Sequence, residues 1–204
     1  MKDCCNSMNS ILYAPGRNND MSVLSAFRDC LGESFPLKIL DLKFDEGSFE
    51  PSRFRDIVEN DSDWWIGISL GASFLYYVWD IAVIKPARLT LINPFSSRKI
   101  LSYEKHFDMK DQWDFTPKNK RCNVECIDVV ISLYDHSVPI YHGLELLNQT
   151  EAQIKNLICI SSNHQIPELT KQKELAAILV NLAKGYPGEK QYMYCNVYQW
   201  QRAI

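Results

Sequence analysis

Apolar and polar positions along this chain form alternating blocks of two kinds. Short, nearly continuous apolar runs predict β-strands at Ser10–Gly16, Leu37–Phe44, Asp63–Ser69, Ala87–Phe95, Val124–Tyr134 and Leu157–Ser162. Between these runs, helices are expected over Met21–Leu31, Arg53–Glu59, Leu70–Ile84, Val138–Leu147 and Lys171–Lys184. Alternating strands and helices, with strands apolar on both faces, are typical of a parallel sheet covered on both sides. The pattern therefore predicts an α/β fold with a mostly parallel central sheet and helices on both faces.

Two segments do not follow this alternation. Residues 96–123 are charged and aromatic without a clear period, which indicates an insertion packed over the rest of the domain. Residues 185–204 form a C-terminal extension with several aromatic residues between Tyr192 and Trp200. No Gly-, Ser- or Pro-rich linker divides the chain, and 204 residues are within the range of one domain. We therefore expect a single domain over residues 1–204.

The composition narrows the class of protein. Apolar residues make up 46% of the chain, which is enough for a core and too much for a disordered protein. The longest apolar run, Ile66–Ile84, is interrupted by glycine, serine and aspartate, which argues against a membrane span. The chain has 22 basic and 25 acidic residues, so its formal net charge is −3. This slightly acidic balance argues against a nucleic-acid partner.

The seven cysteines bear on the compartment and on metal binding. Their odd number and irregular spacing, and the lack of an apolar signal segment at the N-terminus, predict reduced thiols in a cytoplasmic protein. Cys122 and Cys126 are four positions apart, and Cys4 and Cys5 are adjacent. Neither pair has a matching Cys or His pair at the spacing of a zinc site. We therefore expect no metal and no other cofactor.

The sharpest chemical motif lies where an expected strand meets a helix. Gly67-Ile68-Ser69-Leu70-Gly71 matches G-x-S-x-G, which in this context presents a nucleophilic serine on a tight turn. The glycines would avoid Cβ collisions with the neighbouring strand and helix. The helix N-terminus would direct partial positive charge at the serine. Two glycines and a serine at a crowded turn are also a common structural feature, so the motif alone leaves both interpretations open.

A second motif follows the expected strand Val124–Tyr134. Asp135, Val138 and Pro139 fit a D-x-x-V-P pattern, and together with the serine motif they resemble the α/β-hydrolase family. In that family an acidic residue after a late strand orients the catalytic histidine. The resemblance places this histidine at His164, just after the next expected strand. The alternative is that Asp135 only caps the helix that Pro139 begins.

The three candidate residues occur in the order serine, acid, histidine, each at the carboxyl end of an expected strand, as in this family. The resemblance implies that Ser69 is the nucleophile, His164 the general base and Asp135 the residue that orients the base. It also implies an oxyanion hole made by the backbone N–H groups of Leu70 and Arg17. The Arg17 side chain could contact an anionic group of the substrate or lie in solvent.

The resemblance covers essentially the whole core and implies a compact member of the family. The chain begins at the strand that usually comes third, so the first antiparallel hairpin is expected to be missing. The insertion 96–123 occupies the position of a cap, and its Trp113 and Phe115 could line an acyl pocket or pack onto the domain body. Three further histidines have no nucleophile to pair with and are expected to be structural or at the surface: His106, His136 and His142.

These residues predict a serine hydrolase that cleaves a carboxylic ester or an acyl thioester through an acyl-enzyme intermediate. Its substrate would be a small-molecule or carrier-bound acyl compound. The same three residues would serve an enzyme of acyl transfer or release in a biosynthetic pathway. The competing class is a non-catalytic interaction module on a hydrolase fold, in which the aromatic C-terminal extension would hold a partner. The joint presence of serine, acid and histidine argues against that class.

Overall fold

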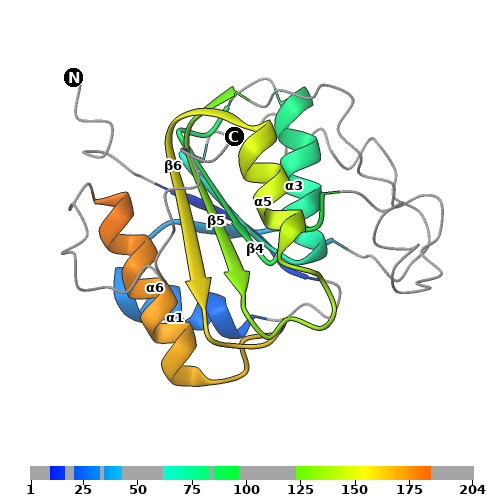
Figure 1. The fold of residues 1–204 in the computed structure, drawn as a ribbon. Coiled ribbons are helices and arrows are strands. Elements are labelled where there is room, and N and C mark those ends of the chain that lie inside the picture. The colour runs from blue at the N-terminus through cyan, green and yellow to red at the C-terminus, as the bar shows by residue number, and fades with distance from the viewer. Residues whose placement is uncertain are drawn as a thin grey trace.

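Six parallel strands form the sheet at the centre of the structure (Figure 1). The computed structural model describes residues 10–16, 21–32, 35–42, 62–82, 85–96 and 123–184. Within these ranges the strands are β1 (Ile11–Ala14), β2 (Leu37–Ile39), β3 (Trp64–Ile68), β4 (Arg88–Ile92), β5 (Asn123–Ser132) and β6 (Glu151–Ile160). Their order across the sheet is β2-β1-β3-β4-β5-β6, and every neighbouring pair is parallel. The predicted fold class is confirmed, and the described part of the chain contains no antiparallel hairpin.

Helices cover both faces of this sheet (Figure 1). On one face lie α1 (Ser22–Leu31) and α6 (Leu169–Ala183), and on the other lie α3 (Leu70–Ile81) and α5 (Tyr141–Gln149). Successive strand residues point to opposite faces, so the paired tryptophans of β3 divide between two cores. Trp64 packs on the α1 and α6 side and Trp65 on the α3 and α5 side, and both are buried.

Several element boundaries differ from the sequence-based prediction. Strand β2 ends at Ile39 rather than Phe44, and helix α3 ends at Ile81 rather than Ile84. Strand β6 begins at Glu151 rather than Leu157, and it pairs with β5 from its first residue. It lies at the edge of the described sheet, where its first half is largely exposed and polar, so no apolar run marks its start. Helix α5 begins at Tyr141 rather than Val138, because the residues after Asp135 form a turn. The helix expected over Arg53–Glu59 lies outside the described residues.

A buried ion pair ties β4 to β5 near the amino end of β4. Arg88 donates two hydrogen bonds of 2.7 Å to the carboxylate of Asp128, whose side chain is fully buried. The hydroxyl of Thr90 and the amide of Asn156 also donate to this carboxylate. Arg88 donates further to the Leu182 carbonyl oxygen of α6. Four donors therefore compensate the charge of Asp128, as a buried carboxylate requires.

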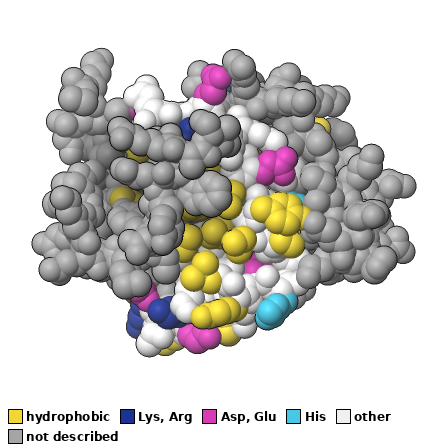
Figure 2. Space-filling model, viewed as in Figure 1, with side chains coloured by type: hydrophobic (Ala, Val, Ile, Leu, Met, Phe, Trp, Pro, Cys, Tyr) yellow, Lys and Arg dark blue, Asp and Glu magenta, His cyan; other side chains and the backbone are white. Residues whose placement is uncertain are grey.

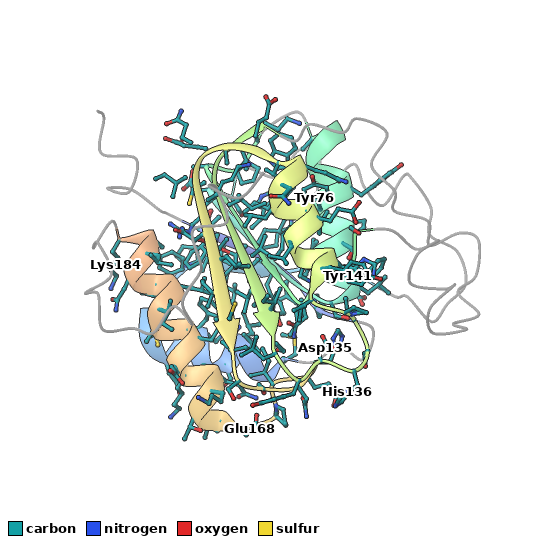
Figure 3. The ribbon with its side chains drawn as sticks, in the orientation of Figure 1. Tyr76, Asp135, His136, Tyr141, Glu168 and Lys184 are labelled. Carbon is teal, nitrogen blue, oxygen red and sulfur yellow. The ribbon has the colours of Figure 1, made fainter. Side chains whose placement is uncertain are left out.

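The parallel sheet gathers the loops that follow its strands at one edge. The segments after β3, β5 and β6 all leave the sheet at this carboxyl edge, which Figure 3 marks with Asp135, His136 and Glu168, while Tyr76 lies toward the opposite end. Ligands of open α/β sheets bind outside the carboxyl ends of the strands. Among the described helices, none is long and apolar enough to cross a membrane.

Candidate active site

Ser69 lies in the sharp turn between β3 and α3. Its backbone φ of 52° and ψ of −120° lie outside the regions that residues with a side chain ordinarily occupy. Its N–H donates a 2.7 Å hydrogen bond to the carbonyl oxygen of Ile92, the last residue of β4. The strained turn is therefore fixed to the neighbouring strand, and strain of this kind gathers at functional sites.

Both glycines of the G-x-S-x-G motif lie directly against backbone. A Cβ on Gly67 would lie 2.5 Å from the Cα of Ala72, in the first turn of α3. A Cβ on Gly71 would lie 2.3 Å from the carbonyl oxygens of Ala14 and Pro15, at the end of β1. No side chain fits at these distances, so the motif meets a steric requirement of the turn, as the sequence analysis expected.

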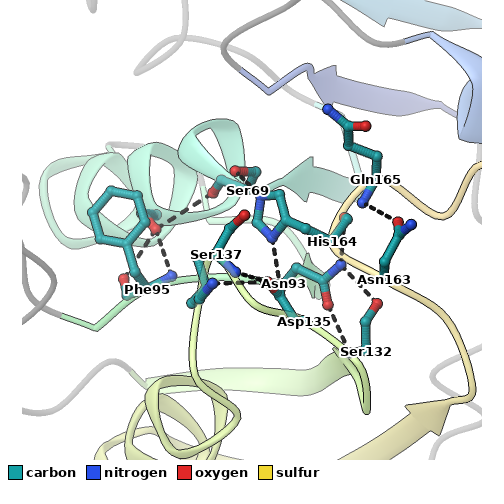
Figure 4. A network of polar contacts seen from close by, with 11 residues as sticks. Ser69, Asn93, Phe95, Ser132, Asp135, Ser137, Asn163, His164 and Gln165 are labelled. Atoms are coloured by element: carbon teal, nitrogen blue, oxygen red, sulfur yellow. Dashed lines mark hydrogen bonds and ion pairs between the residues drawn. The ribbon is translucent and has the colours of Figure 1, made fainter. Parts of the chain in front are cut away.

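Three side chains from three loops form a chain of hydrogen bonds at this edge (Figure 4). The Oγ of Ser69 lies 2.7 Å from Nε2 of His164, although 95 residues separate them in sequence. The Nδ1 of His164 lies 2.6 Å from Oδ2 of Asp135. An ionised carboxylate can only accept, so Nδ1 carries the proton and Nε2 is free to accept from the serine hydroxyl. The histidine side chain is 18% exposed and the aspartate side chain 2%.

Asp135 uses its two oxygens for different purposes. Its Oδ2 contacts His164, whereas its Oδ1 accepts the backbone N–H groups of Ser137 and Val138 at 2.7 and 2.8 Å. The second set of bonds closes the turn that precedes α5. Asp135 therefore does not cap α5, whose N-cap residue is Ile140 without a side-chain cap. It holds the preceding turn with one oxygen and leaves the other for the histidine.

Two residues at this edge were not singled out from the sequence. Ser73, one helical turn after Ser69, donates to the Phe95 carbonyl oxygen and accepts the Phe95 N–H, which ties α3 to the segment after β4. Asn93, directly after β4, donates to the backbone carbonyl oxygen of His164 at 2.8 Å. Both are buried polar residues, and a polar residue at a strand end or on an apolar helix is the signal that points to them.

The remaining candidate residues fall into two groups. Leu70 is the first residue of α3, so its N–H is one of the four amides without a partner inside the helix. His136 is exposed in the turn after Asp135, and His142 is buried in α5 with its Nδ1 2.9 Å from Oγ of Ser96. Outside the described residues lie the oxyanion candidate, the pocket candidates, the remaining histidine and nearly all of the insertion, namely Arg17, Trp113, Phe115, His106 and residues 97–122.

The described residues hold no cluster of three or more His, Cys, Asp or Glu side chains that could bind a metal ion. Within the described residues, backbone supplies positive charge at the site. The N-terminus of α3 carries a partial positive charge from aligned peptide dipoles, and it begins directly after Ser69. The arrangement can therefore move a proton between serine and histidine beside a set of backbone N–H donors.

Comparison with known proteins supports the fold. No protein-family model matches the sequence, and no curated protein matches it significantly. Solved structures do match, among them alpha/beta hydrolase domain-containing protein 10 from mouse, with a TM-score of 0.65 and 13% identity over 88% of this chain and 91% of that one. The esterase domain of a Rhodothermus marinus protein has a TM-score of 0.62 and 12% identity, with 88% of each chain covered.

A third match is the RedJ thioesterase from the prodiginine biosynthetic pathway of Streptomyces coelicolor. It has a TM-score of 0.62 and 12% identity, over 87% of this chain and 91% of that one. Identities this low establish the architecture alone. The chain has the α/β-hydrolase fold that its motifs resemble. It shares the parallel sheet, the helices on both faces and the sharp strand-to-helix turn at Ser69.

Proposed function

We propose that this protein is a serine hydrolase that cleaves a carboxylic ester or an acyl thioester on Ser69, His164 and Asp135. The observation that carries the proposal is the hydrogen-bonded chain from Ser69 Oγ to His164 Nε2 and from His164 Nδ1 to Asp135 Oδ2. A nucleophile in contact with a base, and a base in contact with an orienting acid, is the arrangement that nucleophilic acyl chemistry requires.

The proposed reaction has two halves. Ser69 Oγ attacks the acyl carbon while its proton passes to Nε2 of His164, and the imidazolium then gives that proton to the departing alkoxide or thiolate. The acyl group remains on Ser69 as an ester. In the second half His164 takes a proton from water, the hydroxide attacks the acyl-enzyme, and the proton returns to Ser69 as the acid leaves. Asp135 stabilises the imidazolium in both halves.

The tetrahedral intermediates carry a negative oxygen that needs N–H donors, each worth about 3–4 kcal/mol of barrier. The Leu70 N–H at the start of α3 is the first proposed donor. The second is the Arg17 N–H, in the segment that follows β1. The contact of Gly71 with the carbonyl oxygens of Ala14 and Pro15 supports this choice, because it brings the end of β1 against the first turn of α3.

The substrate is proposed to have an apolar acyl part. Large hydrophobic side chains are exposed in the segment around Asp135, namely Leu133, Tyr134, Ile140 and Tyr141. Figure 2 shows hydrophobic side chains at the surface on this face of the molecule. Exposed apolar groups beside a polar reaction centre favour a ligand that has an apolar part and a polar part. Trp113 and Phe115 of the insertion are proposed to extend this lining.

Esters and thioesters share the attack and the oxyanion chemistry, so the site supports both. Among the structural neighbours, one is an esterase domain and another a thioesterase. Water is the proposed acceptor of the acyl group, and transfer to a different acceptor in a biosynthetic pathway is the second candidate. A cytoplasmic location is part of the proposal, and it rests on the odd number and irregular spacing of the seven cysteines.

The proposal is tested with a fluorophosphonate probe and with acyl substrates. The wild-type protein should be labelled at Ser69, and intact mass should reveal an acyl-enzyme with a panel of esters and acyl thioesters. Ser69→Ala should abolish both signals while its melting temperature stays near that of the wild type. Labelling that persists in Ser69→Ala would rule out Ser69 as the nucleophile. A wild-type protein that is folded but neither labelled nor acylated would favour the non-catalytic interaction module.

A further inference from the structure

We propose that Asn93 is a positioning residue, whose buried carboxamide holds the backbone of His164 at the distance from Ser69 that proton transfer needs. The inference rests on the proposed hydrolase function, because it concerns the base of that reaction. Asn93 does not touch the reacting atoms. It would act only through His164.

The carboxamide of Asn93 makes three hydrogen bonds, two that it donates and one that it accepts. Its Nδ2 donates to the backbone carbonyl oxygen of His164 at 2.8 Å and to Oγ of Ser132 at 2.9 Å. Its Oδ1 accepts the N–H of Ser132 at 2.8 Å. Asn93 is only 2% exposed, so these bonds replace water completely. A buried amide with its bonds made fixes its partners in one arrangement.

The backbone at Asn93 is itself in an uncommon state. Its φ is 48°, in the left-handed region that asparagine tolerates better than most residues with a side chain. This conformation follows directly after the last residue of β4. A residue held in such a conformation needs support from its surroundings, which the contacts with β5 and with the His164 loop provide.

The position of Asn93 links the two reacting groups. Ile92, the preceding residue, accepts the N–H of Ser69 with its carbonyl oxygen at 2.7 Å. Asn93 then holds the carbonyl oxygen of His164 (Figure 4). Two adjacent residues at the end of one central strand therefore hydrogen-bond to the backbones of both the nucleophile and the base.

His164 needs such an anchor because of where it lies. It belongs to the irregular segment between β6 and α6, outside any strand or helix. Its ring contacts Ser69 and Asp135, but a ring held only at its tip can shift with its backbone. A displacement of about 1 Å at a reacting group can cost roughly 100-fold in rate. Fixing the backbone of His164 to β4 restricts that displacement.

The test compares Asn93→Gly with Ser132→Ala. Glycine adopts the φ of 48° without strain and removes the whole carboxamide. Ser132→Ala removes the other acceptor of Nδ2 but leaves the bond to His164, so it is the matched control for lost buried polar contacts. Steady-state kinetics with p-nitrophenyl butyrate, melting temperature, and the proton NMR signal of the His164 Nδ1–H are measured for both variants. Asn93→Ser, whose shorter side chain stops short of His164, replaces the glycine variant if that variant does not fold.

For Asn93→Gly we expect kcat to fall about 10- to 100-fold with KM unchanged, because the ground-state contacts of the substrate are untouched. The far-downfield signal of Nδ1–H should broaden or shift. Ser132→Ala should keep both kcat and this signal, even with a similar loss of melting temperature. Wild-type kcat in Asn93→Gly, or an equal loss of kcat in the two variants at equal melting temperature, would overturn the proposal. If the wild-type protein has no hydrolase activity, the NMR comparison still decides whether Asn93 positions His164.

Discussion

Gly71 and Ala14 are in such close contact that a Cβ on the glycine would lie 2.3 Å from the carbonyl oxygen of Ala14. The contact joins the first turn of α3 to the end of β1, and backbone cannot move aside as a flexible side chain can. This contact thereby fixes how closely the turn that contains Ser69 lies against the end of β1.

The first prediction follows from this contact. Gly71→Ala should lower stability by about 3 kcal/mol, at the upper end of overpacking effects, because two backbone carbonyls must shift. Gly16→Ala is the control, since a Cβ there would meet its nearest atoms at an ordinary 3.4 Å. Urea unfolding measures both variants. Equal stability of the two would show that the turn yields easily.

The choice of base is tested with two histidines near Asp135. His164→Ala should lower kcat/KM by roughly 10³-fold or more, because the members of such a triad act as a unit. His136→Ala should retain activity, since its side chain is exposed in the turn and the His164 ring occupies Oδ2 of Asp135. Hydrolysis of p-nitrophenyl esters by the two variants is compared at equal protein concentration. Loss of activity in His136→Ala alone would reverse the assignment.

The roles of the two carboxylate oxygens of Asp135 can be distinguished by substitution. Asp135→Asn keeps an oxygen that can accept the N–H groups of Ser137 and Val138, but presents an NH₂ group to Nδ1 of His164. The imidazole then favours the wrong tautomer, and kcat should fall by roughly 10⁴-fold. Asp135→Ala also loses the turn and should have the lower melting temperature. If Asp135→Asn retained its rate, the carboxylate would serve only the turn.

We expect the buried ion pair of Arg88 and Asp128 to affect stability and not the reaction. Asp128→Ala leaves the Arg88 guanidinium buried without its carboxylate, which should cost about 3–5 kcal/mol. The pair lies toward the amino end of β4, away from the Ser69 turn, so kcat per folded molecule should stay unchanged. Urea unfolding and kinetics below the transition are measured together. A lower kcat in fully folded Asp128→Ala would connect this cluster to the site.

The insertion is tested through acyl chain length. If Trp113 lines the acyl pocket, Trp113→Ala should weaken the binding of substrates with long acyl chains most. The loss should be about 0.8 kcal/mol for each methylene left unburied. Acetyl esters should be nearly unaffected. The comparison of kcat/KM across acetyl, butyryl and octanoyl esters, with melting temperature as a control, decides the matter. A loss that is independent of chain length and accompanied by lower stability would mean that Trp113 packs onto the domain body.

Local spacing along the chain was enough to predict most of the described elements and the chemistry of the Ser69 turn. Alternation of apolar strands with helices predicts a parallel sheet covered on both faces, and the structure has this arrangement. The glycines at positions 67 and 71 mark a tight strand-to-helix turn, since steric fit there depends on a few neighbouring residues. The three candidate catalytic residues could be named from the G-x-S-x-G motif and from the resemblance to the α/β-hydrolase family, and each of them follows an expected strand of a parallel sheet.

Which polar groups meet across the sheet could be learned only from the folded chain. The bond from Asn93 to His164 spans 71 residues, and the bond from Arg88 to Asp128 spans 40. Such pairs depend on the register of neighbouring strands, and a shift of one residue would turn each side chain to the opposite face. The hydrophobic pattern also did not predict the start of β6 at Glu151, because an exposed edge strand can be polar. Periodicity records which face is buried, whereas hydrogen-bond partners are set by strands that meet only when the chain folds.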